Sequence, residues 1–578
     1  MQLRTVSMGG QSSSNPMIRY FAAGICLLLF AAVSAPARSE LNASSARKPS
    51  GDAARFHETS IGKIPGGSQL VDLQAAADQV AWVEHKPSTD KWLVRRNGEQ
   101  QGAKYDGVKY LEFSSDGAHL AFFGQRGSKW VLVLDGQERS PEYVDVTPVV
   151  FQPHGTSWAY GACAMDQSCQ LVVDGRATGE AYEQVSFPQY SLDGKRIAYL
   201  SETKEKWTPV VDGKPLGPPA EAYSYWGFSP NGAHFFVCGD VKKVGWTYVL
   251  DGHPGPGFSV VGPIAFSNDG KDYAYGASEV QYGFAKNKLS GTVVVDGKAG
   301  SSFQGGGLVG EWTVLLNAPI MAAEIYGNTG FISFFLLYPA SGARVLAPRV
   351  YGVSDASFDG KGNVAYAARR GSKDVVVIDG DQAGPQFDDV VSDIVFTKDG
   401  LHSAYVALRG RDFVEVHNDQ VTKVLSLDSP PVSDPLKSDE DSGANKPAPA
   451  PPDPNLFSVA WTRMTEDGNH FAYQVVHGGP SFRVGKTSHA RRIVVLDGQP
   501  GKRYNADGIS TLDFSDDAKH YWYTVSGADG KRSLVVVDGD ESKLYNDLTE
   551  AHLDDTRKSV IFFGRSGARI LRITCALR

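Results

Sequence analysis

The sequence predicts an all-β fold that is built from about twelve copies of one small unit. Three observations lead to this prediction. An apolar run that ends in Asp-Gly returns at nearly constant spacing, a second Asp-Gly phrase lies between successive copies, and the segments between these turns are short and rich in β-branched and aromatic residues. In the early copies the first phrase recurs every 38 or 39 residues, and a fixed period in this range indicates a repeat architecture.

The first phrase is an apolar run that leads into a turn. Its copies are VLVLDG at Asp135, QLVVDG at Asp174, PVVDG at Asp212, YVLDG at Asp251, VVVDG at Asp296, VVVIDG at Asp379, IVVLDG at Asp497 and LVVVDG at Asp538. An Asp-Gly pair between two β-prone runs predicts a hairpin with a type I′ turn, because both central positions of that turn need a positive φ.

The second phrase lies about midway between the copies of the first. It reads FSSDGAHLAF from Phe113, YSLDGKRIAY from Tyr190, FSPNGAHFFV from Phe228, FSNDGKDYAY from Phe266 and FTKDGLHSAY from Phe396. We expect the same type of turn here, so that one period holds four short antiparallel strands. Four such strands in roughly 40 residues form one blade of a β-propeller. A parallel α/β fold would need helical crossovers, for which the period leaves no room.

The third strands of the predicted blades end near residues 97, 135, 174, 212, 251, 296, 338, 379, 418, 497, 538 and 574. Propellers usually have four to eight blades. We therefore predict two six-bladed rings in tandem, with the first propeller at residues 68–301 and the second at 308–578. The Gly-rich stretch near 302–310 would separate the rings. A seven-plus-five division remains open.

Two residue types recur at fixed positions of the repeat. Tryptophan stands five residues before the turn residue at Trp92, Trp130, Trp207 and Trp246. We interpret it as packing between blades, and an exposed ladder that binds sugar or peptide is the alternative. Histidine stands two residues beyond the first turn at His119, His234, His402, His470 and His520. We interpret it as a polar residue at the start of a strand, and a ring of metal ligands is the alternative.

The N-terminal segment predicts export. An apolar run, YFAAGICLLLFAAV, follows Arg19, and small residues stand at Ala35 and Ala37. This order is that of a secretory signal peptide, residues 1–37, and the run is too short to span a bilayer comfortably. We expect a flexible lead-in at 38–67 and an exported protein, periplasmic or extracellular, with no transmembrane anchor after cleavage.

Four cysteines follow the predicted cleavage site. Cys163 and Cys169 face each other across a hairpin loop, which predicts a disulfide in the export compartment. Cys238 and Cys575 fall in different predicted rings, and we expect both to be buried and reduced. CxxC spacing does not occur, so the sequence indicates no metal site.

Charge and composition limit the classes of partner that the protein is expected to bind. The net charge is −8, and acidic and basic residues are mixed along the chain, which gives no footprint for nucleic acid. Residues 428–455 are rich in proline and nearly free of large apolar side chains, so we predict a disordered insertion between blades.

Long loops on one face are the candidate binding site. In a four-stranded meander the first and third turns lie on one face, and the second turn lies on the other. The long insertions fall at the second turns and at the links between blades, which share the other face. Variable loops on a rigid scaffold are where binding normally resides. The candidate residues are Arg483, Lys486, His489, Arg491 and Arg492 in one loop, and Tyr282, Phe284, Lys286 and Lys288 in another. The alternative is ordinary solvated loop charge.

The FSxDGxxxAY phrase resembles the WD-like repeat of TolB-type propellers, and the alternating VVVDG phrase is similar to that of bacterial exported repeat proteins of the same broad superfamily. The resemblance covers residues 68–575 and implies a propeller fold. It does not imply the Tol–Pal role of TolB, because nothing in the chain matches the small α/β domain that TolB adds. Some related propellers are polysaccharide lyases, and no residue here can be matched to that activity.

These features predict an exported, non-catalytic β-propeller scaffold that binds a protein or envelope ligand. We find no GxSxG elbow, HExxH motif, P-loop or dinucleotide fingerprint, and we expect no cofactor. The alternative is a propeller enzyme, a polysaccharide lyase or hydrolase, with a site in a central funnel that the sequence does not identify.

Overall fold

The computed structural model describes residues 55–578 except 267–269, 271–272, 282–287, 300–302, 306–313, 318–319, 328–331, 340–343, 346–356, 359–363, 371, 379–380, 398, 411, 427–456, 478–490, 528–530 and 555. The predicted signal peptide and the Pro-rich insertion at 428–455 lie outside the described residues. The described part of the chain is all-β and contains no helix that could cross a membrane.

The described strands form ten hydrogen-bonded antiparallel sheets, nine of four or five strands and one of thirteen. We divide the thirteen-stranded sheet into three successive units by the repeat and number the resulting units as sheets 1 to 12. Sheet 1 contains β2 (Gln69–Ala76), β3 (Gln79–Lys86), β4 (Lys91–Arg96) and β5 (Glu99–Tyr105). Sheet 2 contains β6 (Gly107–Phe113), β7 (Leu120–Arg126), β8 (Lys129–Leu134) and β9 (Gln137–Glu138). Sheet 3 contains β10 (Asp145–Val146), β11 (Val150–Phe151), β12 (Trp158–Cys163), β13 (Cys169–Val173) and β14 (Arg176–Tyr182).

Sheet 4 contains β15 (Gln184–Val185), β16 (Gln189–Tyr190), β17 (Ile197–Thr203), β18 (Lys206–Val211) and β19 (Lys214–Pro215). Sheet 5 contains β20 (Tyr223–Phe228), β21 (Phe235–Val241), β22 (Gly245–Leu250) and β23 (His253–Pro254). Sheet 6 contains β24 (Val260–Phe266), β25 (Tyr273–Gln281), β26 (Lys288–Val295), β27 (Lys298–Ala299) and β28 (Phe303–Gly305). Sheet 7 contains β29 (Val314–Asn317), β30 (Ile320–Gly327), β31 (Ile332–Pro339) and β32 (Arg344–Val345).

Sheet 8 contains β33 (Ser357–Phe358), β34 (Val364–Arg370), β35 (Lys373–Ile378) and β36 (Asp381–Phe387). Sheet 9 contains β37 (Asp389–Val390), β38 (Val395–Phe396), β39 (Ser403–Arg409), β40 (Asp412–His417) and β41 (Gln420–Ser426). Sheet 10 contains β42 (Phe457–Met464), β43 (Phe471–His477), β44 (Arg491–Leu496) and β45 (Gln499–Ile509), and β45 continues into sheet 11. Sheet 11 adds β46 (Asp513–Phe514), β47 (Tyr521–Gly527), β48 (Arg532–Val537), β49 (Asp540–Glu541) and β50 (Tyr545–Asn546). Sheet 12 contains β51 (His552–Leu553), β52 (Ser559–Ser566), β53 (Arg569–Ala576) and β1 (Phe56–Lys63).

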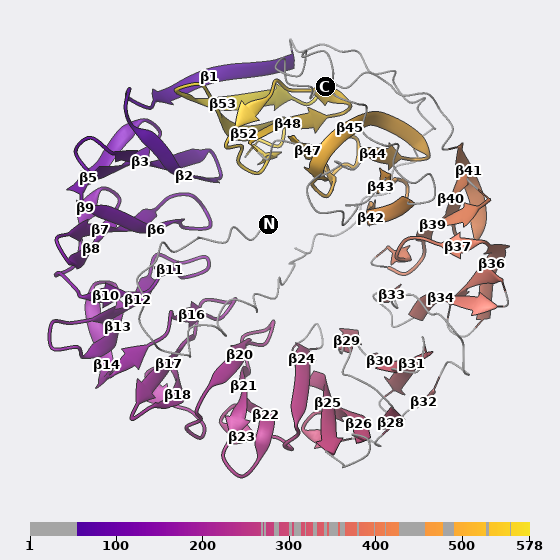
Figure 1. Cartoon of the computed structure of the whole chain (residues 1–578), viewed down its shortest axis with the longest axis horizontal. Helices are drawn as coiled ribbons and strands as arrows, with labels where there is room; N and C mark the ends of the chain where they lie inside the picture. The colour runs from indigo at the N-terminus through magenta and orange to yellow at the C-terminus, as the bar shows by residue number, and fades with distance from the viewer. Residues whose placement is uncertain are drawn as a thin grey trace, which may run out of the picture.

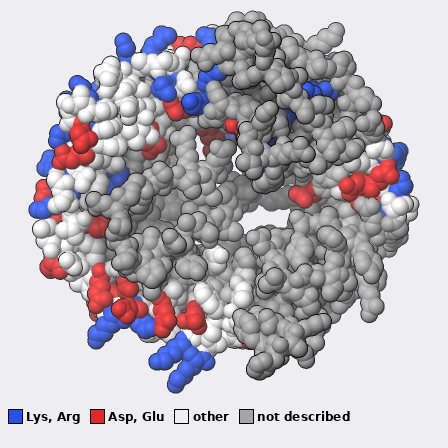
Figure 2. All heavy atoms as spheres, in the orientation of Figure 1, with Lys and Arg blue, Asp and Glu red and all other residues white. Residues whose placement is uncertain are grey.

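The sheets stand round one central axis, and β2, β6, β20 and β24 lie on the side of their sheets that faces the centre (Figure 1). This radial arrangement of four-stranded antiparallel sheets is that of a β-propeller, as the repeat predicted. Acidic and basic side chains are interspersed along the outer rim (Figure 2), in agreement with the mixed charge of the sequence.

The turn after the third strand is of the predicted type. Asp135 and Gly136 both have a positive φ, 49° and 75°, as the two central residues of a type I′ turn require. The Asp135 carboxylate also accepts a hydrogen bond from the Leu120 amide at 2.9 Å. Aspartate therefore recurs at this position because its side chain ties the third strand to the start of the second.

The turn in the second phrase differs from the type I′ turn that we expected. Gly117 has a φ of 69°, whereas Asp116 does not have a positive φ. The Gly117 amide donates to the Ser114 carbonyl at 2.8 Å, and the Asp116 carboxylate accepts from the Ser114 hydroxyl and the Ala118 amide. The phrase thus forms a four-residue turn with a left-handed residue in last place, where glycine is favoured. Aspartate is favoured at position 116 because its carboxylate accepts these two hydrogen bonds.

Apolar layers fill the spaces between neighbouring sheets. Val83 of sheet 1 packs with Phe122 of sheet 2, whereas Phe123 packs with Tyr160 of sheet 3. Successive residues of a strand point to opposite faces, so a strand between two sheets is apolar throughout. The recurring tryptophans Trp92, Trp130, Trp207 and Trp246 pack against these same layers, which confirms their interpretation as packing residues.

Sheet 1 packs against sheet 12. Trp82 lies in one apolar cluster with Ile561 and Phe563, and the side chain of Arg572 forms an ion pair with Asp78 at 3.0 Å. In addition, β1 pairs with β53 from Phe56 opposite Cys575 to Lys63 opposite Arg569. The N-terminal strand therefore supplies the fourth strand of the last sheet.

This packing bears on two expectations. Two separate rings would place sheet 1 beside sheet 6, whereas among the described residues sheet 1 packs against sheet 12 and β29 lies beside β24 and β25. The bounds 68–301 and 308–578 stay a prediction. The repeat defines a blade and carries no signal for which blades meet when the ring closes. The lead-in at 38–67 was expected to be flexible throughout, yet Phe56–Lys63 form β1, because pairing with β53 satisfies their backbone groups.

Candidate functional site

The connection between the second and third strands of sheet 10 holds the first set of candidate residues. Arg491 and Arg492 begin β44, where Arg491 pairs with His477 of β43. Arg483, Lys486 and His489 lie outside the described residues. The structure thus places the ends of this loop at one end of a hairpin.

The two described arginines differ in their surroundings. The side chain of Arg491 is exposed, whereas Arg492 is half-buried and its Nε donates to the Ala506 carbonyl at 3.1 Å. Burial lowers the pKa of Arg492, and the nearby Asp507 opposes this effect. Because Arg492 is bound to the neighbouring strand, Arg491 is the one of the two that is available to a ligand.

The second set belongs to sheet 6. Lys288 is the first residue of β26 and its backbone pairs with Gln281 of β25. Tyr282, Phe284 and Lys286 lie outside the described residues. This loop therefore leaves its sheet at the same hairpin position as the loop of sheet 10.

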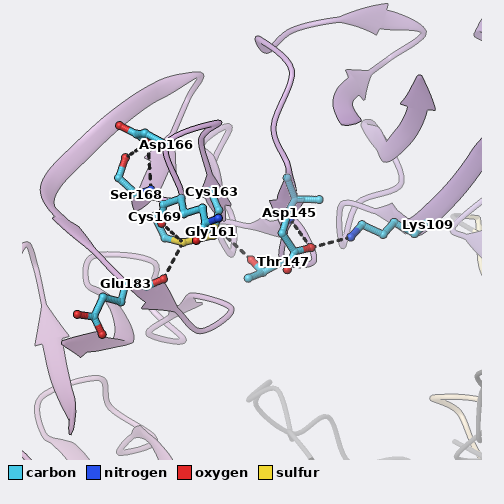
Figure 3. The surroundings of a disulfide bond; sticks show 11 residues. Lys109, Asp145, Thr147, Gly161, Cys163, Asp166, Ser168, Cys169 and Glu183 are labelled. Atoms are coloured by element: carbon cyan, nitrogen blue, oxygen red, sulfur yellow. Dashed lines mark hydrogen bonds and ion pairs between the residues drawn. A yellow bond between two sulfur atoms is a disulfide. The ribbon is translucent and has the colours of Figure 1, made fainter. Parts of the chain in front are cut away.

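In sheets 3 and 4 the same connection is short. In sheet 4, Lys204 and Glu205 form a tight turn with φ values of 53° and 60°. In sheet 3, Cys163 and Cys169 are joined by the predicted disulfide (Figure 3), with their Cα atoms 4.0 Å apart. Connections at this position therefore range from a tight turn to the span between His477 and Arg491.

The loop that the disulfide closes has a well-defined conformation. The Asp166 carboxylate accepts from the Ser168 amide at 3.0 Å and from its hydroxyl at 2.7 Å. Met165 projects from this loop with 63% of its surface exposed. Figure 3 shows Asp166 and Ser168 beside the two cysteines. The disulfide and the carboxylate together fix the loop on the face that carries the longer insertions.

The other two cysteines are free and buried, as expected. Burial raises the pKa of Cys238 to about 12 and that of Cys575 to about 11. Neither thiol therefore forms a thiolate near neutral pH, which argues against nucleophilic chemistry at these positions.

The repeated histidines pair with the repeated turn residues of their own sheets. His119 Nδ1 lies 2.7 Å from Asp135 Oδ2, and His234 Nδ1 lies 2.6 Å from Asp251 Oδ2. His470 and His520 pair in the same way with Asp497 and Asp538, and His402 pairs with Asn418. These contacts confirm the interpretation as a polar residue at the start of a strand. Among the described residues, no three His, Cys, Asp or Glu side chains gather in a group that could hold a metal ion.

Exposed aromatic side chains on the inner strands were not identified from the sequence. Tyr110, Phe187 and Tyr225 are 40%, 51% and 39% exposed. Each stands three residues before the aromatic residue that opens the second phrase, at Phe113, Tyr190 and Phe228. Aligning the repeats on that phrase would have revealed the shared position.

No family model matches the chain, and no curated protein matches it. Solved structures resemble it weakly. A structure of the eukaryotic initiation factor is 11% identical, with a TM-score of 0.34 over 68% of this chain and 96% of that one. Dipeptidyl peptidase 4 from Porphyromonas gingivalis is 10% identical, with a TM-score of 0.30 over 66% of this chain and 64% of that one. The β-propeller domain of the Trilobed protease from Pyrococcus furiosus is 10% identical, with a TM-score of 0.22 over 62% of this chain and 99% of that one. At these scores we infer nothing about function from the likeness, and the fold is assigned from the strand pairing of this chain.

Proposed function

We propose that the protein is an exported, non-catalytic β-propeller scaffold of the TolB-like, WD-like superfamily, which binds a protein or cell-envelope ligand through the long loops on one face. The observation that carries the proposal is the contrast between the two faces. Side-chain bonds from Asp116 and Asp135 fix the turns on one face. On the other face the connections vary widely in length, and variable loops on a rigid scaffold are the usual place for binding.

Two features support an exported location, periplasmic or extracellular. The bond between Cys163 and Cys169 suits an oxidising compartment, in which disulfides persist. Residues 1–37 have the composition of a secretory signal peptide.

The charge of the loop in sheet 10 points to the kind of ligand. Arg483, Lys486 and Arg491 make this loop basic, and Arg491 is exposed where the loop enters β44. Guanidinium groups recognise carboxylate and phosphate groups well, because their planar fork can form two hydrogen bonds at once. A ligand with acidic groups, on a protein or on the envelope surface, is therefore the occupant that we propose.

A loop replacement tests the proposal. Residues 478–490 are replaced by Asn-Gly, which forms a type I′ turn and can join His477 to Arg491 without changing their register. We expect the shortened chain to keep its melting temperature and to lose binding to a purified partner that the intact chain captures from an envelope extract. The control is Lys204→Asn on the short turn of the same face. Equal binding by the shortened and intact chains would remove the loop from the site.

A further inference from the structure

The first strands of several early sheets depart from regular pairing. Register shifts interrupt β6 between Lys109 and Glu112, and β20 between Tyr223 and Tyr225. In sheet 4 the first strand is divided into β15 and β16, with Phe187 between them. Bulges re-aim side chains, and the exposed rings of Tyr110, Phe187 and Tyr225 stand at or beside these irregularities.

These aromatic residues stand on or beside the first strands of sheets 2, 4 and 5, and we call the first strands of sheets 1 to 5 the inner wall. Figure 1 shows β6, β16 and β20 along the side of their sheets that faces the centre. Single exposed apolar residues are normal on a protein surface, but three exposed rings at one repeat position are a pattern. The ring of Phe187 lies 5.7 Å from that of Trp226, so the row continues on β20.

Carboxylates accompany the rings. Glu112 is exposed two residues after Tyr110, and Asp72 lies on β2 of the neighbouring sheet. Burial, and then the charge of Asp72, raise the pKa of Glu112 to about 7. The edge of the Glu112 side chain is exposed to solvent, so a ligand can reach it. The two carboxylates lie close enough to repel each other, and a cation between them would relieve that repulsion.

A cation already lies against aromatic rings beside Tyr110. The Lys109 ammonium lies 5.0 Å from the centre of the Tyr110 ring and 4.3 Å from that of Trp130. It also forms an ion pair with Asp145 at 3.2 Å. The surroundings of Tyr110 therefore hold an ammonium between aromatic rings and a carboxylate, and the chain's own Lys109 is the cation there.

We propose that the inner wall of sheets 1 to 5 binds an extended basic peptide segment of a partner protein. Aromatic faces attract cations through the ring quadrupole, and carboxylates attract them through charge. Because the rings of Tyr110, Phe187 and Tyr225 come from three different sheets, the ligand must be long. An extended chain with lysine or arginine side chains is both long enough and positively charged. A neutral glycan would gain nothing from the charge of Glu112 and Asp72.

The test uses the full mature chain and a fluorescein-labelled (Lys-Ala)5 peptide, with (Glu-Ala)5 and cellohexaose as competing ligand types. We expect the basic peptide to bind, and the acidic peptide and the glycan to bind at least tenfold more weakly. Phe187→Ser with Tyr225→Ser should raise the Kd for (Lys-Ala)5 about tenfold. Glu112→Gln should raise it severalfold and reduce its dependence on salt. Met165→Ser removes an exposed apolar side chain elsewhere and should leave the Kd unchanged.

A second aromatic variant separates binding from folding. Phe187→Leu with Tyr225→Leu keeps apolar side chains at both positions and removes the ring faces, so it should fold like the parent and bind as weakly as the serine variant. Melting temperatures of all variants are measured alongside. Absence of (Lys-Ala)5 binding by the parent chain, equal binding of the acidic peptide, or full binding by the leucine variant would each overturn the proposal. Preferential binding of cellohexaose would assign the wall to a glycan instead.

Discussion

The phenolic oxygen of Tyr545 donates a hydrogen bond of 2.6 Å to the carboxylate of Glu58, and this bond joins sheet 11 to the N-terminal strand. The same pairing links other neighbouring sheets. Tyr105 donates to Glu138 at 3.0 Å, and Tyr504 donates to Glu541 at 2.6 Å. In each pair a tyrosine that follows the third strand of one sheet meets a glutamate of the fourth strand of the next. The strand β1 therefore occupies the position of a repeat at the closure of the ring.

Removing the hydroxyl of Tyr545 should lower the stability of the protein. We expect Tyr545→Phe to lower the free energy of unfolding by about 1.5–3 kcal/mol, which is the usual range for a hydrogen bond to a charged group. Denaturant unfolding measures the change. The matched control is Tyr105→Phe, which removes the same bond between sheets 1 and 2. If neither variant changes stability, these hydrogen bonds do not hold the sheets together.

The pH dependence of stability should reflect Glu58. The hydrogen bond from Tyr545, followed by the interactions of Lys543, lowers the pKa of Glu58 below its ordinary 4.5, although burial opposes this shift. A carboxyl with a lowered pKa in the folded state contributes stability that is fully present above 4.5 and is lost as the pH falls through the folded value. We expect the difference in melting temperature between the parent and Glu58→Gln to shrink as the pH is lowered from 6 to 3. A difference that stays constant over this range would contradict the assignment.

Arg55 should be among the most sensitive positions of the chain. Its guanidinium is buried and donates to Asp538 at 2.7 Å, to Asp540 at 3.1 Å and to the Ala576 carbonyl at 3.1 Å. Arg55→Ala removes the guanidinium that faces Asp540 and the Ala576 carbonyl, while Asp538 keeps its contacts with His520 and the Tyr521 amide. Because a buried carboxylate then loses its cation, we expect a loss of about 3–5 kcal/mol in the free energy of unfolding.

Two further variants show whether this loss comes from the buried charge. Arg55→Met with Asp540→Asn should recover part of it, because the second change removes one uncompensated carboxylate. Arg557→Ala removes an exposed ion pair with Asp516 and should cost less than about 1 kcal/mol. Equal losses from the exposed and the buried arginine would refute this explanation.

Ala518 is a site where glycine should stabilise the protein. It has a φ of 56° in the first turn of sheet 11, where Gly117 of sheet 2 has 69°. A left-handed alanine costs about 1–2 kcal/mol of conformational strain, which glycine would relieve. The greater freedom of glycine in the unfolded chain cancels about half of that gain, so we expect Ala518→Gly to raise the free energy of unfolding by about 0.5–1 kcal/mol. In the reverse test, Gly117→Ala would place a Cβ 2.6 Å from the Ala76 carbonyl and should be clearly destabilising. Thermal unfolding of both variants checks the two signs.

The disulfide should stabilise its hairpin. Cys163→Ser with Cys169→Ser opens a short loop, and we expect a loss of about 2 kcal/mol. Reducing agent should then lower the melting temperature of the parent and leave that of the double variant unchanged. In native protein without residues 1–37, a thiol reagent should find Cys238 and Cys575 unreactive, because both are buried. Rapid labelling of either would contradict their placement.

Repeated residues made much of the fold predictable. Asp135 and Gly136 specify a type I′ turn in any sequence that has β-prone runs on both sides, so the blades could be derived from local rules. The first turn was harder to predict, because Asp116 acts through its side chain rather than through a positive φ. Ring closure was not predictable, since Arg55 and Glu58 resemble no repeat phrase and meet Asp538 and Tyr545 hundreds of positions away.

The candidate site was predictable to a smaller extent. The long connections and the cysteine pair were visible as interruptions of the repeat. The exposed aromatic residues Tyr110, Phe187 and Tyr225 were not predicted, because the segments that contain them have the composition of ordinary apolar strands. They stand at or beside irregularities of pairing, which depend on how each first strand pairs with the second rather than on its composition.

The most direct test of the account asks which sheet the N-terminal strand closes. His57 of β1 lies opposite Thr574 of β53. A chain with His57→Cys and Thr574→Cys should form an intramolecular disulfide under mild oxidation, which peptide mapping by mass spectrometry detects. The comparison chain carries His57→Cys and Lys298→Cys, the latter on β27 of sheet 6. A single ring closed by β1 predicts a bond in the first chain and none in the second, whereas a bond in the second chain and none in the first would contradict it.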